Sequence, residues 1–262
     1  MEAKKISVEK DGYVLLIGLD RADKRNALDL DMYWQLAAAY GELHNNPDLR
    51  CGLLFAHGDH FTAGLDLVQW APVFAEGKSP DIPEGMIDPF GLDEDRRLSK
   101  PLVMAAQGIC YTIGFEMLLT TDVRVAASNL RLAQIEVKRG IYPVGGATVR
   151  MFQEIGWANA MRYLLTGDEI TAQEAYRLGL VQEVTEPGQE FERALELATK
   201  ISKQAPLGVQ AALRSARLAR VDGTRKALER LLPDIIPIMK SEDSAEGVKA
   251  FIERREANFK GR

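Results

Sequence analysis

Two glutamates lie in stretches of this sequence that are otherwise mostly apolar. Glu116 follows Phe115 and precedes Met-Leu-Leu, and Glu136 lies between Ile135 and Val137. Burial among apolar side chains raises the pKa of a carboxyl group, which suits it to proton transfer near neutral pH. A helix-dipole contact or a buried hydrogen bond would explain each glutamate equally well, and spacing alone does not bring the two together.

Two glycine-containing turns could supply a second part of a catalytic site. One spans residues 60–66, soon after an apolar run that ends at Ala56, and the other spans residues 107–116. Each leads into a helical pattern, where the first backbone N–H groups lack a helical partner and can bind an anion. Gly114 permits close backbone approach. Two amides aimed at one oxygen would form an oxyanion hole, although ordinary strand-to-helix turns remain the alternative.

Other catalytic motifs are missing from the sequence. There is no GxSxG, P-loop or GxGxxG motif, which disfavours a serine hydrolase, an NTPase and a dinucleotide-binding enzyme. His57 and His60 flank a Gly-Asp pair, but only His44 remains to complete a metal site. We therefore predict no metal site.

Composition narrows the class of protein further. The 262 residues include 33 Lys and Arg against 38 Asp and Glu, a net charge of −5, so we expect neither a nucleic-acid nor a membrane partner. Cys51 and Cys110 are too few for a disulfide framework, and no signal peptide or membrane-spanning run is visible. These features predict a cytoplasmic enzyme.

The elements that would position such a site alternate along the first half of the chain. A helical pattern over residues 29–45 ends at Asn46-Pro47, and it lies among short unalternating apolar runs. Such runs are typical of buried parallel strands, so the pattern predicts an α/β fold of βαβ-like units. Strands are expected at residues 13–19, 51–56, 102–106 and 123–127.

Residues 71–99 differ from the rest of the first half. Prolines and glycines interrupt every periodicity there, and a connection of this length is usually either disordered or a lid over a site. Its large apolar side chains would be unusual in a solvated linker, so a lid is the favoured interpretation. These side chains are Trp70, directly before the segment, and Val73, Phe74, Met86, Ile87 and Phe90 within it.

From about residue 145 the pattern is helix after helix. Thr171 and Glu174 have the spacing of a capping box, in which the hydroxyl and the carboxylate each satisfy a free amide at the helix start. Near the end of the chain, one helical face is expected to pack either on the protein's own core or on a neighbouring subunit. That face carries Phe251, Ile252 and Phe259.

Several short motifs follow one another in a characteristic order over nearly the whole chain. They are Lys24-Arg-Asn-Ala-Leu28, Phe61-Thr-Ala-Gly-Leu-Asp66, Lys100-Pro101 leading to Gly108, Asp122, Glu136 with Gly140-Ile-Tyr-Pro-Val-Gly-Gly146, Leu164-Leu-Thr-Gly167 and Ala175-Tyr-Arg-Leu-Gly-Leu-Val181. Together they resemble the crotonase superfamily, the enoyl-CoA hydratase/isomerase family. The resemblance implies a spiral of ββα units over residues 1–195, with a lid insertion at about 71–99. It also implies a helical trimerisation region over residues 196–262.

The resemblance further implies a substrate and a site. A coenzyme A thioester would bind with its carbonyl oxygen between the backbone N–H groups of Leu65 and Ile113. The two carboxylates of the family's hydratases fall on Glu116 and Glu136, whereas its isomerases commonly retain only the later acid. Both carboxylates would then hold and deprotonate a water that attacks the β-carbon, and Glu136 would deliver a proton to the α-carbon.

Coenzyme A is thus expected as part of the substrate, with no prosthetic group. The family's coenzyme A contacts would fall on Lys24, Arg25, Ala63, Asp66, Leu67 and the Lys260 of a neighbouring subunit. The chain departs from the family pattern at three places. Thr112-Ile113-Gly114 replaces three Gly or Ala residues, Leu65 replaces a common alanine, and Val68 stands where many members have a lysine.

Reversible addition of water to a 2-enoyl-CoA is the leading functional hypothesis. A second hypothesis assigns other acyl-CoA chemistry to the same residues: isomerisation, retro-aldol cleavage or thioester hydrolysis. A third is a non-catalytic acyl-CoA-binding protein. In each case the family resemblance implies a homotrimer or a dimer of trimers.

Overall fold

The computed structural model, which describes residues 4–262, contains a six-stranded sheet in the order β1-β2-β3-β4-β6-β9. β1 and β2 form an antiparallel hairpin, and the other neighbouring pairs are parallel, which confirms the predicted α/β arrangement. All four predicted strands are present, the first of them one residue shorter than expected. The strands are β1 (Ile6–Asp11), β2 (Val14–Leu19), β3 (Cys51–Ala56), β4 (Leu102–Ala106), β6 (Val123–Ala127) and β9 (Glu183–Thr185).

A second, three-stranded sheet contains β5 (Ile109–Tyr111), β7 (Arg131–Ala133) and β8 (Ile170–Thr171). Consecutive strands divide between the two sheets: β4 and β6 belong to the large one, and β5 and β7 to the small one. A helix follows each pair, namely α3 (Ile113–Leu118) after β5 and a 3-10 turn (Glu136–Arg139) after β7. This repeated path is the spiral of ββα units that the resemblance implies.

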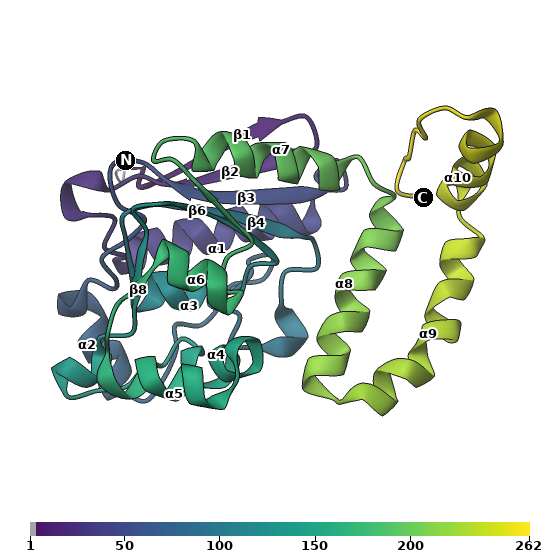
Figure 1. Ribbon diagram of the computed structural model, residues 1–262. Coiled ribbons are helices and arrows are strands. Elements are labelled where there is room, and N and C mark those ends of the chain that lie inside the picture. Colours follow the sequence, from purple (N-terminus) through teal and green to yellow (C-terminus); the bar gives the residue numbers. More distant parts are fainter. Residues whose placement is uncertain (1–3) are drawn as a thin grey trace.

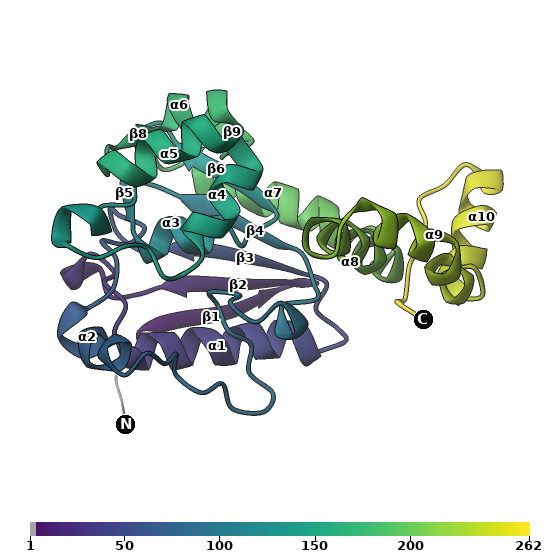
Figure 2. The same cartoon turned by 90° about the horizontal axis from the view of Figure 1, so that it is seen from below.

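Helices cover both faces of the large sheet, as its unalternating apolar strands require. α1 (Leu30–Asn45) begins where predicted, because the Asp29 side chain accepts a hydrogen bond from the Met32 N–H at 2.9 Å. α7 (Glu190–Ser202) lies across the other face, where Ala194 and Ala198 pack against β2, β3, β4 and β6 (Figures 1 and 2).

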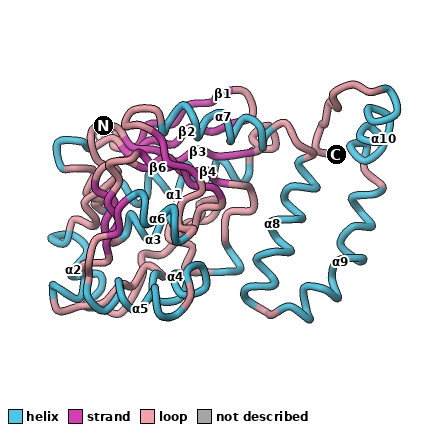
Figure 3. The backbone as a smooth tube through the Cα atoms, in the orientation of Figure 1, coloured by secondary structure: helices cyan, strands magenta, loops and turns pink. Residues whose placement is uncertain are grey.

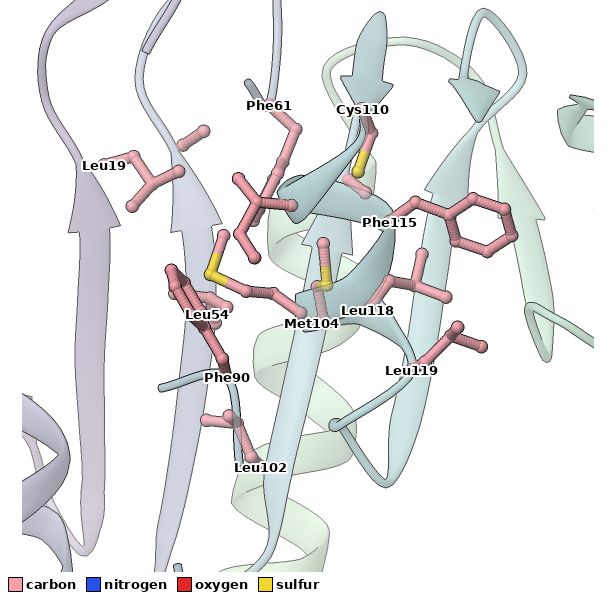
Figure 4. Close-up of a cluster of buried hydrophobic side chains, with 14 of the residues drawn as sticks. Leu19, Leu54, Phe61, Phe90, Leu102, Met104, Cys110, Phe115, Leu118 and Leu119 are labelled. Atoms are coloured by element: carbon pink, nitrogen blue, oxygen red, sulfur yellow. The ribbon is translucent and has the colours of Figure 1, made fainter. Parts of the chain in front are cut away.

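The core beneath α3 joins the two sheets. Phe115 and Leu118 of α3 belong to the same buried cluster as Leu54 of β3 and Met104 of β4 (Figure 4). Each of these side chains is buried, and burying one such side chain contributes about 1.5–3 kcal/mol. The short helix α3 is therefore fixed on its inner side by packing.

The segment predicted as a lid begins within a helix. α2 (Leu67–Ala75) continues through Pro72 to Ala75, although the proline was expected to interrupt it. A proline at this position removes one hydrogen bond but leaves the helix intact where packing holds it. Further along, Ile87 and Phe90 are buried, and the Ile87 N–H donates to the Ala37 carbonyl of α1 at 3.2 Å.

The capping box at Thr171 is only half formed. The Thr171 hydroxyl accepts from the Glu174 N–H at 3.3 Å, as predicted, and α6 begins there. The Glu174 carboxylate was predicted to accept from a free backbone amide at the helix start. It instead accepts from the Tyr163 hydroxyl and the charged Arg177 guanidinium, which compete with that amide. The helices of this region are α4 (Ala147–Ile155), α5 (Trp157–Thr166) and α6 (Ala172–Leu178).

Three helices form an arm that leaves the α/β body (Figures 1 and 3). They are α8 (Pro206–Val221), α9 (Thr224–Met239) and α10 (Glu242–Glu253). Phe251 and Ile252 are exposed on α10. Phe259 was predicted to share their helical face, but it lies outside the helix. α10 ends before it, because Arg254 adopts a left-handed conformation at the C-cap. None of the helices within residues 4–262 is long and apolar enough to cross a membrane.

Candidate active site

The two glycine-containing turns lie side by side in parallel register. Thr62 pairs with Cys110 of β5 in a parallel bridge, and the Thr62 N–H donates to the Ile109 carbonyl at 3.0 Å. Leu65 and Ile113 each come three residues after one member of this pair. The two segments therefore leave the bridge together, and their turns stay adjacent.

Two glycines allow the turns to approach each other this closely. A β-carbon at Gly64 would overlap with the Thr112 hydroxyl, and one at Gly114 would overlap with a methyl group of Thr62. The expected close backbone approach at Gly114 is thus confirmed. Thr112 itself has a φ of 50°, which is a strained conformation for a β-branched residue and is typical of functional turns.

The amides of Leu65 and Ile113 are available at these turns. Ile113 is the first residue of α3, so its N–H has no helical acceptor. Leu65 lies in a parallel bridge with Leu28. In this bridge the Leu28 carbonyl accepts from the N–H of Asp66, so the N–H of Leu65 is not used. Within residues 4–262, neither amide donates a hydrogen bond to a protein acceptor. Both can therefore bind an external oxygen.

Glu116 lies in the first turn of α3 and is buried. Its Oε1 accepts a hydrogen bond from the Ala147 N–H at 2.9 Å. Burial raises the pKa of Glu116 to about 7, while the N–H groups of Gly145 and Ala147 and the charge of Arg150 act in the opposite direction. The carboxyl is held in place and titrates near neutral pH.

Glu136 begins the 3-10 turn after β7, and its side chain is also largely buried. Burial is the main cause that raises the pKa of Glu136 to about 7, and the negative charge of Glu116 adds to it. The Glu136 Oε2 atom is buried without a hydrogen-bond partner. An unpartnered buried carboxyl oxygen is unusual and marks a group that is free to bind or to transfer a proton.

The Ile113 side chain lies next to Glu116. A β-carbon at Gly145 would be 2.5 Å from Glu116 Oε2 and 2.6 Å from Ile113 Cδ1. The isoleucine methyl and the carboxyl oxygen therefore lie within about 5 Å of each other. Ile113 is itself buried and helps to exclude water from Glu116, which agrees with the raised pKa.

Most of the predicted coenzyme A contacts cluster at one side of these turns. The Ala63 N–H donates to the Arg25 carbonyl at 2.9 Å, which brings the turn at Lys24 and Arg25 against residues 63–65. Asp66 precedes α2 and forms an ion pair with Arg21 at 3.3 Å. Leu67, the first residue of α2, is about half exposed.

Lys260 lies apart from the others within one protomer. It follows α10, where the chain has returned to the base of the arm (Figure 1): the Phe259 carbonyl accepts from Arg50 at 2.8 Å, and the Lys260 backbone N–H donates to the Asp243 carboxylate. Arg50 directly precedes β3, whereas the first turn follows the other end of that strand, so Lys260 lies at the opposite edge of the sheet from the turns. The expectation that it serves a neighbouring subunit stays a prediction.

Gly145, Ala147 and Arg150 were not predicted individually as site residues. They became visible as site residues only through the hydrogen bond to Glu116, which joins α3 to the start of α4. One sequence signal could have indicated them: the Gly145-Gly146 pair lies directly before a helical pattern, where the first backbone N–H groups lack helical acceptors.

The two histidines near the first turn have other roles. His60 Nδ1 accepts from the Ile109 N–H at 3.3 Å, and His57 Nε2 lies 2.8 Å from the Ser7 hydroxyl. Residues 4–262 contain no group of three or more side chains that could hold a metal ion.

Known proteins resemble this chain along its full length. The family model described as enoyl-CoA hydratase/isomerase matches residues 9–262. The chain belongs to this family. The crystal structure of a probable enoyl-CoA hydratase/isomerase from Mycobacterium abscessus is 46% identical, with a TM-score of 0.94 over 98% of this chain and 99% of that one.

Curated relatives agree with this membership. An enoyl-CoA hydratase of Mycobacterium tuberculosis is 38% identical over 97% of this chain and 96% of its own length. A carnitinyl-CoA dehydratase of Salmonella heidelberg is 32% identical over 99% of this chain and 100% of its own length. The family membership and the crotonase-type fold inferred from the motifs are therefore confirmed.

Proposed function

We propose that this protein is an enoyl-CoA hydratase-type lyase, which adds water reversibly to a 2-enoyl-CoA thioester. The observation that carries the proposal is the pair of buried carboxyls at Glu116 and Glu136, both with a pKa of about 7, beside two free backbone amides. The names of the hydratase and dehydratase relatives support it.

The mechanism follows from the charge that develops during the reaction. Water held by Glu116 and Glu136 attacks the β-carbon, and one of its protons passes to Glu136. The electrons of the carbon–carbon double bond move onto the thioester oxygen, where the N–H groups of Leu65 and Ile113 stabilise the negative charge. When this enolate collapses, Glu136 returns the proton to the α-carbon, so the two carboxylates end as they began.

The coenzyme A portion is part of the substrate, and the reaction needs no prosthetic group. We assign its contacts to Lys24, Arg25, Ala63, Asp66 and Leu67, whose backbone and side chains surround the turn at residue 64. Val68, which is exposed on α2, offers no charge to the nucleotide phosphates, so the basic turn at Lys24 and Arg25 carries that role.

We also propose that the protein is a homotrimer or a dimer of trimers. The arm exposes many large apolar side chains, and exposed apolar patches of this kind mark interaction surfaces. A neighbouring subunit that covers the arm could present Lys260 to this site. The exposed apolar side chains of the arm are Val221, Leu228, Leu231, Leu232, Ile235, Ile236, Met239, Val248, Phe251 and Ile252. Light scattering at micromolar concentration is expected to report a trimer or hexamer, and a monomer would contradict this.

A cytoplasmic location is proposed on the basis of Cys51 and Cys110. Both cysteines are free and buried, and burial raises the pKa of Cys51 to about 12. Such thiols need no disulfide partner and suit a reducing compartment. Fractionation of the source cells with detection by antibody tests this location.

Product analysis separates hydration from other acyl-CoA chemistry. Purified protein is incubated with crotonyl-CoA and with longer and aromatic 2-enoyl-CoAs, and the products are identified by mass spectrometry. A gain of one water with the thioester intact is the expected result. Free coenzyme A would indicate thioester hydrolysis, an unchanged mass with a moved double bond would indicate isomerisation, and binding without any product would indicate a non-catalytic protein.

A further inference from the structure

Arg150 of α4 is a buried cation that bonds to two separate segments of backbone. Its guanidinium donates to the carbonyls of Gly145 at 3.0 Å, Phe90 at 3.1 Å and Gly91. Only 7% of its surface is exposed, and within residues 4–262 it forms no ion pair. A buried charge is costly unless its donors are satisfied, so the side chain depends on these carbonyls and they depend on it.

One of the two segments is the turn that holds Glu116. Ala147 and Gly145 supply the N–H groups that contact the Glu116 carboxyl, and Arg150 donates to the Gly145 carbonyl of the same turn. A β-carbon at Gly146 would overlap with the guanidinium. Movement of Arg150 would therefore displace the amides that orient Glu116.

The other segment belongs to residues 71–99, the predicted lid. Asp88 accepts from the N–H groups of Phe90 at 2.9 Å and Leu92 at 3.0 Å, and from the Tyr33 hydroxyl at 3.2 Å. These bonds fold the segment into a tight turn that presents the carbonyls of Phe90 and Gly91 to Arg150. Arg150 thereby connects the predicted lid to the turn that holds Glu116.

We propose that Arg150 is a positioning residue, which ties the Phe90–Gly91 turn of the predicted lid to the Gly145–Ala147 turn and so fixes the orientation of Glu116. Where it concerns catalysis, this inference rests on the proposed function. The charged groups that face Arg150 are Asp88, Glu94 and Arg97 from the predicted lid and Glu116 from α3.

Arg217 provides a matched control for this role. Its guanidinium donates to the Leu98 carbonyl, at the other end of the same segment, and to Asp122 at 3.1 Å. It is a partly buried arginine bonded to the segment, like Arg150, but it bonds to Leu98 and Asp122 instead of the turn that holds Glu116. Arg217→Met therefore tests whether any loosening of the segment has the same effect.

The test combines kinetics with a direct titration of Glu116. Arg150→Met, Arg150→Lys and Arg217→Met are compared with the parent for kcat, KM and the pH profile of hydration. Carbon-13 NMR of protein labelled at the glutamate carboxyls follows the titration of Glu116, whose signal is assigned as the one missing in Glu116→Gln. If Arg150→Met does not fold, Arg150→Gln replaces it, because its amide keeps N–H donors without the charge.

For Arg150→Met, kcat is expected to fall on the order of 10- to 100-fold with a smaller change in KM, because the carboxyl is misplaced. The pKa of Glu116 should rise, because a nearby positive charge is lost. Arg150→Lys should restore the titration and part of kcat, and Arg217→Met should stay within about threefold of the parent.

An unchanged kcat and an unchanged Glu116 titration in Arg150→Met would overturn the proposal. Equal effects in Arg217→Met would overturn it as well, because they would assign the role to the segment as a whole. If the parent shows no hydration at all, the proposed function fails, while the NMR titration still decides whether Arg150 positions Glu116.

Discussion

The charge of Glu116 raises the pKa of Glu136, and burial brings both carboxyls to a pKa of about 7. Two interacting carboxyls titrate as a pair, with apparent pKa values that belong to both. At neutral pH this pair readily gives and takes a proton, which is what water addition and its reversal require.

The pH dependence of activity should reflect the pair. Because the mechanism needs carboxylates to accept a proton, kcat/KM should fall as pH drops through about 7. In Glu116→Gln the remaining activity should keep its acidic limb, but shifted to lower pH, because the neighbouring negative charge is gone. Steady-state rates between pH 5 and 9 measure both effects. An acidic limb at the same pH in parent and variant would contradict the coupling.

Stability should change with pH in the opposite sense to activity. A carboxyl whose pKa rises from 4.5 to about 7 on folding binds its proton more tightly in the folded protein. Below pH 4.5 the carboxyl is protonated in both the folded and the unfolded protein, so its burial does not lower the free energy of unfolding. As pH rises through 7, the free energy of unfolding falls by on the order of 1–3 kcal/mol.

Glu116→Gln removes this penalty. Its free energy of unfolding should exceed that of the parent at pH 8.5, and the gap should shrink toward pH 4.5. Urea unfolding at the two pH values measures the difference. A gap that is constant with pH would contradict the raised pKa of Glu116.

The sequence predicted the sheet better than it predicted the site. The strands at residues 51–56, 102–106 and 123–127 could be placed because buried parallel strands leave an uninterrupted apolar run. The raised pKa values at Glu116 and Glu136 were expected from apolar neighbours in the chain. Their electrostatic coupling could not be predicted from local sequence, since it depends on how α3 and the turn at residue 136 meet in space.

Gly145→Ala should disturb Glu116 directly. The added methyl group would lie 2.5 Å from Glu116 Oε2 and 2.6 Å from Ile113 Cδ1, so both side chains must move or the turn itself must shift. We expect kcat to fall about 100-fold, because misplacement of a catalytic group by about 1 Å has an effect of this size.

Gly208→Ala in α8 is the matched control. Its nearest atom, the Ala205 β-carbon, would be 3.9 Å away, so the methyl group fits. This variant should keep the parent rate and gain up to about 1 kcal/mol of stability, because alanine favours a helix interior. Equal rates in the two variants would contradict the assigned position of Glu116.

The side chain of Ile113 should restrict groups at the β-carbon of the substrate. Ile113→Ala opens space beside Glu116, so kcat/KM for a 3-methyl-2-enoyl-CoA should rise at least 10-fold relative to crotonyl-CoA, as expected for a few methyl groups in an apolar pocket. Leu118→Ala, a buried residue of the same helix, controls for lost packing. If both variants leave the substrate ratio unchanged, Ile113 does not set this preference.

Two errors in the sequence predictions have a common cause. Phe259 was assigned to a helical face that ends at Glu253, and Glu174 was assigned to an amide although it binds Arg177 and Tyr163. Both predictions extended a local pattern to a place where a cap or a distant partner decides the structure. The role of Arg150 was missed for the same reason, because its acceptors Phe90 and Gly91 lie about 60 residues away.

Loss of the conjugated enoyl thioester, followed by ultraviolet absorbance, is a direct measure of hydration and of the role of Glu136 in it. The parent and Glu136→Gln are compared on crotonyl-CoA and on longer and aromatic 2-enoyl-CoAs, with calorimetry to show that both bind acyl-CoA. We expect rapid loss with the parent and a rate lower by on the order of 10²–10⁴-fold with Glu136→Gln, because proton transfer is removed while binding remains. Turnover at the parent rate by Glu136→Gln would contradict this role of Glu136.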